Sequence, residues 1–255
     1  MPTGGSFLNI KDFTLEPYNP SHDGDSGALF LATSKEDSAT QYIVKSATPE
    51  LACNEYMYHK AASALGLHTQ EVKLFLPSPR FRYAAGIRYE KDAREATQAD
   101  LSVGASCFPD FIAFQTLYVI LNEEDSQEYY LDGDGRLFKL DNAASFNMQS
   151  YDVAMLNAIS EDEAIEKLRR KLAHTEYNKY AIILRLVTEH HGEAGRSACL
   201  AMFERFTRLD VAALEEAVDD VSEVYSIILG EYYYAFWESR KKLCARFLKE
   251  VDNGE

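Results

Sequence analysis

The sequence has few cysteines, and no two of them stand at metal-binding spacing. Four cysteines occur in 255 residues, far apart and without a C-x-x-C pair. Zinc sites and secreted disulfide frameworks both look different, so neither is indicated. Three of the four lie in apolar or helical surroundings, where a free buried thiol is the common outcome. The four cysteines of the chain are Cys53, Cys107, Cys199 and Cys244. Because none is placed for a zinc site or a disulfide framework, we expect a reducing compartment, the cytoplasm.

Positive charge and long apolar runs are also scarce. Lysine and arginine number 26 against 41 acidic residues, which gives a net charge of −15. This balance argues against a nucleic-acid-binding surface and against docking on an anionic membrane. No run approaches the roughly 18 apolar residues that span a bilayer. The N-terminus shows no basic region followed by an apolar one, so we expect no signal peptide.

The remaining composition is that of a globular protein with one large domain or two lobes that share a cleft. Hydrophobic residues make up 46% of the chain and aromatic residues 12%. Strand-like runs at residues 28–32, 41–45, 72–76 and 83–89 surround one helix, and the polar residues 90–96 form a connector. After about Pro109 the pattern is helical. We therefore predict an α+β fold, with a sheet-rich lobe over residues 1–92 and a helical lobe over residues 93–255.

The helix in the first lobe has clear start and stop signals. Thr48 can cap it, Pro49 suits its first turn, and Gly66 stands where a helix ends. Its apolar stripe, at i, i+3 and i+4 spacing, includes Glu55. A buried carboxylate needs a partner, and Lys45, at the end of the preceding strand, is the nearest basic candidate. The alternative is that Glu55 extends to solvent at the edge of the stripe.

Helical patterns dominate the second lobe. The segment 110–121 is almost wholly apolar and predicts a buried helix. Further helices are expected at 152–159, from Ser160 to about Glu189, and at 197–206, 211–218 and 221–251. The pair His190-His191 precedes Gly192, which indicates a helix end rather than a metal site. The aromatic residues near the C-terminus are expected to pack between helices rather than stack on a ligand. They are Tyr232, Tyr233, Tyr234 and Trp237.

The segment 122–146 carries acidic side chains at two separate points. Acidic residues cluster at its start, the D-G-D-G turn at 132–135 predicts a β-hairpin, and Asp141 ends the second strand. The hairpin brings both sets of carboxylates to the same end. Converging carboxylate oxygens are how proteins hold Mg²⁺. The alternative is a solvated acidic turn.

The order of these elements resembles the protein-kinase-like fold. A strand lysine, a helix glutamate, a connector, a buried helix and an acidic hairpin that ends in aspartate follow one another in that fold. The resemblance is closer to the HipA-like and phosphatidylinositol-kinase-like branch. There the helix commonly reads N-E-x-x-x-x-x-L-A-x-x-L-G-L, and the hairpin contains D-x-D-G-R-L, two further residues, an apolar residue and then Asp. Residues 54–56, 64–67, 131–137 and 140–141 match, and the resemblance covers about residues 26–150.

The resemblance implies an ATP-dependent phosphoryl transfer, most simply to a serine or threonine of a protein. It assigns Lys45 to the α- and β-phosphates, Glu55 to the orientation of Lys45, and Glu123 to the catalytic base. Mg²⁺ or Mn²⁺ would be held by Asp141 with help from Glu128. The phosphate-covering loop would contain Gly27, and the adenine would meet the connector at Tyr89, Glu90 and Lys91. Expected partners are a protein substrate or a regulatory protein.

The chain departs from this pattern at the start of the hairpin segment. Glutamates stand where the family has its catalytic aspartate and metal-binding asparagine, and Glu124-Asp125 replaces an Arg-His pair. The extra acidic charge raises carboxylate pKa values and repels phosphates unless a metal neutralises it. The phosphate-covering loop has no G-x-G-x-x-G, only Gly24 and Gly27. These departures leave two alternatives open: a catalytically impaired nucleotide-binding or regulatory module, and a helical interaction protein with an acidic loop.

Overall fold

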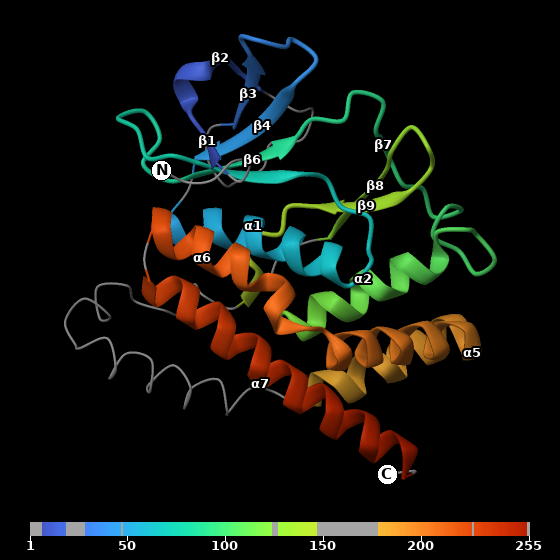
Figure 1. Ribbon diagram of the computed structural model, residues 1–255. Coiled ribbons are helices and arrows are strands. Elements are labelled where there is room, and N and C mark those ends of the chain that lie inside the picture. The colour runs from blue at the N-terminus through green and yellow to red at the C-terminus, as the bar shows by residue number, and fades with distance from the viewer. Residues whose placement is uncertain are drawn as a thin grey trace.

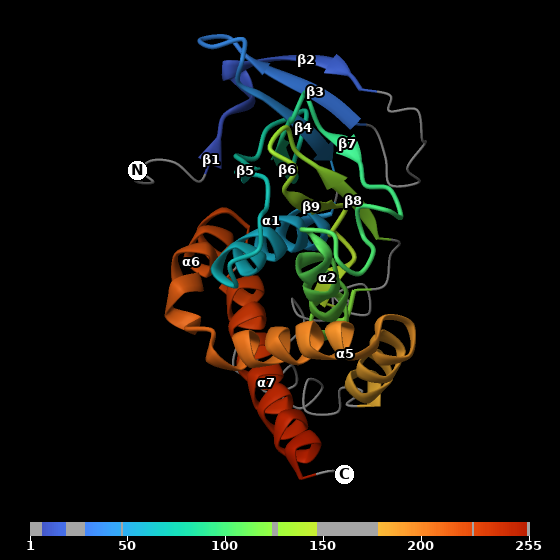
Figure 2. The same cartoon turned by 90° about the vertical axis from the view of Figure 1, so that its right-hand side faces the viewer.

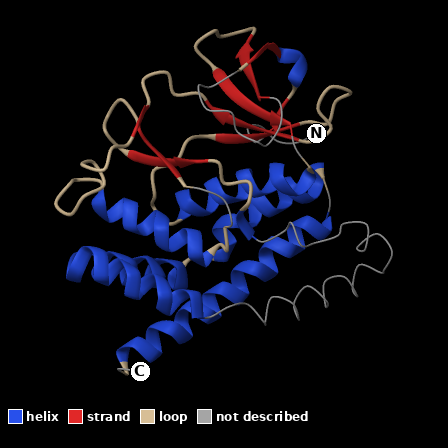
Figure 3. Ribbon diagram, turned by 180° about the vertical axis from the view of Figure 1, so that it is seen from behind, coloured by secondary structure: helices blue, strands red, loops and turns tan. Residues whose placement is uncertain are grey.

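The computed structural model describes residues 7–18, 29–46, 48–123, 127–146, 178–225 and 227–253. Strands gather at one end of the molecule and helices at the other (Figures 1 and 3). Because the two kinds of element are segregated along the chain, the α+β class predicted from the sequence is confirmed. None of the helices in the described ranges is both long and apolar enough to cross a bilayer.

A six-stranded sheet forms the N-terminal part, in the order β1-β5-β6-β4-β3-β2. Strand β1 runs parallel to β5, and every other pairing is antiparallel. The hairpin expected from residues 28–45 is present, and it places β4 between β3 and β6. Lys45 is therefore held between Leu29 on one side and Ala85 on the other. The strands are β1 (Phe7–Leu8), β2 (Phe13–Pro17), β3 (Leu29–Ser34), β4 (Gln41–Ser46), β5 (Val72–Phe75) and β6 (Ala84–Arg88).

Helix α1 (Pro49–Ala64) begins and ends where the sequence predicted. The Thr48 side chain caps it by accepting from the Leu51 N–H, and Gly66 follows with a φ of 77°. A single apolar stripe was expected, but every residue from Ala52 to His59 is buried. The helix lies between the sheet and the helical part, and so it is covered on more than one face (Figure 2). Tertiary packing of this kind leaves no simple trace in the helical periodicity.

The hairpin predicted at residues 129–140 belongs to a second sheet, in the order β7-β8-β9. Strands β8 (Glu128–Leu131) and β9 (Leu137–Leu140) pair around a turn in which Gly135 has a φ of 78°. The connector after residue 89 contains β7 (Arg94–Glu95), which pairs with β8 and so ties the connector to the hairpin. A lobe boundary at residue 92 stays a prediction.

Helices make up the rest of the described chain. Helix α2 (Phe108–Ile120) is the buried helix that the sequence predicted. Helix α5 (Asn178–Arg208) breaks at Gly192, whose φ of 62° is not helical, so the helix end expected after His190-His191 is present as a kink. The predicted segment 211–218 divides into a 3₁₀ helix, η3 (Val211–Leu214), and α6 (Glu215–Val224). The last helix, α7, spans Ile227–Asp252, and the helix predicted at 152–159 and the cap at Ser160 lie outside the described residues.

The large core joins α1 to the C-terminal helices. Tyr232, Tyr233 and Trp237 on α7 are buried in it, as expected. The Tyr233 hydroxyl donates to Asn54 on α1 at 2.7 Å, and the Tyr232 hydroxyl donates to the Phe146 carbonyl at 2.6 Å. All four cysteines are buried and free, which agrees with the sequence prediction. The position of α1, fixed from both sides, sets the geometry of the residues that follow β9.

Candidate functional site

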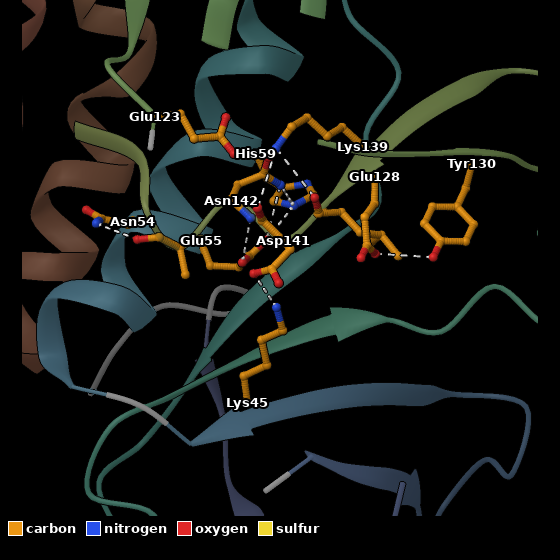
Figure 4. Close-up of polar contacts among 12 residues, drawn as sticks. Lys45, Asn54, Glu55, His59, Glu123, Glu128, Tyr130, Lys139, Asp141 and Asn142 are labelled. Carbon is orange, nitrogen blue, oxygen red and sulfur yellow. Dashed lines mark hydrogen bonds and ion pairs between the residues drawn. The ribbon is translucent and has the colours of Figure 1, made fainter. Parts of the chain in front are cut away.

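An ion pair between Lys45 and Asp141 joins the end of β4 to the end of β9. The Lys45 Nζ lies 2.6 Å from Asp141 Oδ1, and the two side chains are 17% and 29% exposed (Figure 4). These residues are 96 positions apart in the chain. Burial alone would lower the pKa of Lys45, but the negative charges of Glu55, Asp141 and Glu128 outweigh it, and the pKa is raised. Lys45 is therefore a fixed positive charge at neutral pH.

Asp141 has a left-handed backbone conformation, with a φ of 58°. Aspartate and asparagine tolerate this region better than other non-glycine residues. Strand β9 ends at Leu140, so the turn at Asp141 ends the ladder and directs the carboxylate toward β4. Asn122, one residue before Glu123, also has a positive φ, of 52°.

Glu55 does not form the direct ion pair with Lys45 that the sequence suggested. Its Oε2 accepts from the Asn142 N–H at 3.0 Å, and its Oε1 lies 3.1 Å from His59 Nε2. The residue is 1% exposed, which excludes the alternative in which it reaches solvent. Burial by itself would raise the pKa of the Glu55 carboxyl. The His59 contact, the Lys45 charge and the Asn142 N–H together have a larger opposite effect, and the pKa is lowered to about 2. Glu55 is therefore ionised, and it supports the turn after Asp141 rather than Lys45 directly.

Glu123 forms a buried ion pair with Lys139. The Lys139 Nζ lies 2.5 Å from Glu123 Oε1 and 2.6 Å from Asn142 Oδ1, and neither charged side chain is exposed. Burial raises the pKa of the Glu123 carboxyl to about 7, against the opposing effect of the Lys139 ammonium. The second oxygen, Oε2, is buried and has no hydrogen-bond partner among the described residues. Glu123 therefore combines a pKa suited to a base with a position closed to solvent.

Glu128 is the first residue of β8, opposite Leu140. It is exposed, and its Oε2 accepts from the Tyr130 hydroxyl at 3.3 Å. The Glu128 charge is close enough to raise the pKa of Lys45, so its carboxylate shares the neighbourhood of the Lys45–Asp141 pair. In the described ranges no group of three or more His, Cys, Asp or Glu side chains could hold a metal by itself. Two carboxylates nevertheless fit Mg²⁺, which commonly takes one or two from the protein and the rest from phosphates and water.

The connector leaves the sheet at Tyr89, whose N–H donates to the Gln41 carbonyl at 2.9 Å. The Tyr89 ring meets Tyr18 edge to face, with the ring centres 6.0 Å apart. Glu90 and Lys91 are exposed and follow in a turn. The Ala93 N–H donates to the Glu90 carbonyl at 3.2 Å, and the adenine contact expected at Tyr89, Glu90 and Lys91 stays a prediction. Gly27, Gly24 and the segment 124–126 lie outside the described residues.

Sequence reasoning missed the buried polar residues behind Asp141. His59 could have been found, because it lies four positions after Glu55 and so on the same helical face. Lys139 gave no such signal, since an isolated lysine in a short strand usually faces solvent. Asn54, whose side chain donates to the Ala143 carbonyl at 2.8 Å, was matched to a family motif but given no contact. Figure 4 shows a connected group of side chains, with Asn54 apart from it and bonded to the Ala143 carbonyl; the connected residues are Glu55, His59, Glu123, Lys139 and Asn142.

Comparison with solved structures finds a kinase with a similar fold. The chain is similar to the crystal structure of a Helicobacter pylori proinflammatory kinase, CtkA, with a TM-score of 0.63. The match covers 96% of this chain and 99% of the kinase chain, at 12% sequence identity. No family model and no curated protein sequence matches the chain. At 12% identity the likeness shows the fold alone, and it confirms the kinase-like fold expected from the order of the sequence motifs.

Proposed function

We propose that this protein binds ATP with Mg²⁺ or Mn²⁺ and transfers the γ-phosphoryl group to a serine or threonine of a protein, as HipA-like kinases do. The observation that carries the proposal is the Lys45–Asp141 contact. A lysine from the sheet and an aspartate from the acidic hairpin, 96 positions apart, meet at a partly exposed point next to Glu128. One fixed positive charge beside two carboxylates suits a triphosphate and its metal.

The proposed roles divide between the two charges. In the nucleotide complex the Lys45 ammonium contacts the α- and β-phosphates, and Asp141, with Glu128, holds the metal. The metal ion, when bound, neutralises negative charge on the phosphoryl oxygens. The Lys45–Asp141 ion pair holds both side chains at the site until phosphates and metal replace it. Tyr89, Glu90 and Lys91 would meet the adenine from the connector, with Gly27 in the loop that covers the phosphates.

Glu123 is the proposed general base. Its pKa of about 7 lets it accept a proton at neutral pH, and its Oε2 has no partner in the described part of the chain. In the reaction the substrate hydroxyl oxygen forms a bond to the γ-phosphorus and the bond to the β,γ-bridging oxygen breaks. The hydroxyl proton passes to Glu123 Oε2, and ADP leaves.

A transfer assay with two variants tests this function. Purified protein is incubated with γ-labelled ATP, Mg²⁺ and a mixture of acceptor proteins, and label in protein is counted. Lys45→Met and Asp141→Asn should each reduce transfer by roughly 10²-fold or more, because each removes a charge that acts on the transferring group. Lys11→Met and Asp134→Asn are matched controls on exposed residues and should keep wild-type transfer. Wild-type transfer by Asp141→Asn would refute the metal assignment.

A second candidate, a nucleotide-binding regulatory module without turnover, is favoured by the burial of Glu123. Its side chain is fully covered and ion-paired with Lys139, so the role as base requires Glu123 to become accessible when substrate binds, whereas nucleotide binding without turnover does not. Stabilisation by ATP and Mg²⁺ with no loss of the γ-phosphate would support this candidate over the kinase.

A further inference from the structure

Lys139 occupies an unusual place for a lysine. It is 1% exposed, in a strand whose neighbours Leu137 and Phe138 are wholly buried. Its Nζ also lies 5.3 Å from the centre of the Tyr58 ring. An apolar side chain would fill this position without the desolvation cost of an ammonium group, and a buried charge is retained only where several groups compensate it. The polar contacts of Lys139 are with Glu123 Oε1, Asn142 Oδ1 and the carbonyl oxygens of Leu140 and Asp141.

Two of these contacts act on the peptide that joins Asp141 to Asn142. The Lys139 Nζ lies 3.4 Å from the Asp141 carbonyl oxygen, and Glu55 Oε2 accepts from the Asn142 N–H at 3.0 Å. The C=O and N–H of a trans peptide point in opposite directions, so the two charges hold one peptide unit from its two sides. The positive charge faces the carbonyl and the negative charge faces the N–H, which is the favourable alignment with the peptide dipole.

Holding this peptide fixes the conformation of Asp141. Its orientation determines ψ of Asp141, whose φ of 58° lies in the left-handed region, a conformation that aspartate tolerates but that still costs free energy relative to the extended and helical regions. The direction of the carboxylate toward Lys45 follows from this backbone. Asn142 strengthens the arrangement, because its side chain contacts Lys139 through Oδ1 and Glu55 through Nδ2.

We propose that Lys139 is a positioning residue that, together with Glu55, clamps the Asp141–Asn142 peptide and so aims the Asp141 carboxylate at the metal. The aiming of Asp141 at a metal rests on the proposed function. The contacts of Lys139 and Glu55 with the Asp141–Asn142 peptide do not depend on it. The competing explanation is that Lys139 serves only to neutralise the buried charge of Glu123.

A charge-balanced double variant separates these two explanations. Lys139→Met alone would leave Glu123 buried without its counter-ion, and Glu123→Gln alone would do the same to Lys139, so either single variant could fail to fold. Wild-type protein is therefore the reference, and Glu123→Gln/Lys139→Met is the test, since the double variant removes both partners of the buried ion pair and leaves neither charge uncompensated. Two quantities are compared: amide hydrogen exchange of Asn142 without ligand, and the affinity for ATP with and without Mg²⁺. Both report structure or binding rather than turnover, so loss of the base does not affect them.

The clamp predicts that Asn142 exchanges at least about tenfold faster in the double variant than in wild-type protein, the size expected for loss of a charge-assisted contact. Amides in the middle of α2 should exchange equally in both. ATP affinity in the presence of Mg²⁺ should fall about tenfold, and metal-free ATP affinity should not change.

Equal Asn142 exchange in wild-type protein and the double variant would overturn the clamp and leave charge neutralisation as the role of Lys139. Faster exchange with an unchanged Mg²⁺ effect would overturn the aiming of Asp141. If wild-type protein shows no Mg²⁺-dependent ATP binding, the proposed function fails, and the exchange comparison still decides whether the clamp exists.

Discussion

Glu55 and Glu123 are buried in one hydrogen-bonded group, yet their surroundings move their pKa values in opposite directions. Hydrogen-bond donors and the Lys45 charge outweigh burial and lower the pKa of Glu55 to about 2. Burial raises the pKa of Glu123 to about 7, although the Lys139 ammonium opposes this. Separated values of this kind are typical of sites in which one carboxylate supports structure and the other exchanges protons. At the scale of single residues, this difference in pKa is the clearest indication that Glu55 and Glu123 have different roles.

The raised pKa of Glu123 makes folding stability depend on pH. The pKa of Glu123 in the folded state lies above the ordinary value of 4.5, because the buried carboxyl holds its proton more tightly than it does in the unfolded chain. This contribution to folding stability is complete below about pH 4.5 and is lost as the pH rises through about 7. Glu123→Gln cannot ionise and should escape this loss. Its stability relative to wild type should rise by about 1–3 kcal/mol from roughly pH 5 to pH 8.

Urea unfolding at several pH values measures the difference between the two proteins. Glu55→Gln is the matched control, because the folded pKa of Glu55 is lowered and its contribution is lost only as pH falls from 4.5 through about 2. Its stability relative to wild type should not change over roughly pH 5 to pH 8. A difference between Glu123→Gln and wild type that is flat with pH would contradict the shift assigned to Glu123.

Only some of these residues could be predicted from the sequence. Lys45, Glu55, Glu123 and Asp141 were found because their order along the chain resembles a family. The partner of Glu55 was not found, because the Asn142 N–H comes from a turn 87 residues away and backbone donors leave no mark in a sequence. Lys139 was missed for a related reason: its acceptors are assembled by the fold.

At the scale of elements, α1 is the part that connects the sheet, the helices and the site. Its start at Thr48 and its end at Gly66 were predictable, because capping chemistry is local. Its burial on several faces was not, because that depends on the sheet and α7. The hairpin β8–β9 was also predictable from its D-G-D-G turn, whereas its pairing with β7 depends on a contact with the connector.

The contact between α7 and α1 should contribute measurably to stability. Tyr233→Phe removes the hydroxyl that donates to Asn54, and the buried amide oxygen then lacks this donor. We expect a loss of about 1–2 kcal/mol in the free energy of unfolding, measured by urea denaturation. Tyr234→Phe, one residue further on a partly buried position, is the control and should lie within about 0.5 kcal/mol of wild type. A Tyr233→Phe protein as stable as the control would show that the hydrogen bond makes no net contribution.

At the scale of the whole molecule, the Lys45–Asp141 pair joins the six-stranded N-terminal sheet to the β8–β9 hairpin. The fold was predictable because the order of strand, helix, connector and hairpin in the sequence resembles the kinase-like fold, and the chain matches a solved kinase with a TM-score of 0.63 at 12% identity. The chemistry of the site was less predictable, because the protonation and accessibility of its acidic residues depend on how deeply the fold buries each of them. Glu123 is fully covered and Glu128 is exposed, although both read as acidic positions of one loop.

The central claim is that Asp141 holds a metal that helps bind ATP, and melting temperature measured with ATP and Mg²⁺ tests it most directly. At ligand concentrations near 100 times the dissociation constant, wild-type protein should gain about 2.7 kcal/mol, or roughly 5–10 °C. ATP without Mg²⁺ should give a much smaller rise, and Asp141→Asn should lose the Mg²⁺-dependent part while Asp134→Asn keeps it. An equal rise with and without Mg²⁺ in wild type, or an intact Mg²⁺ effect in Asp141→Asn, would contradict the account.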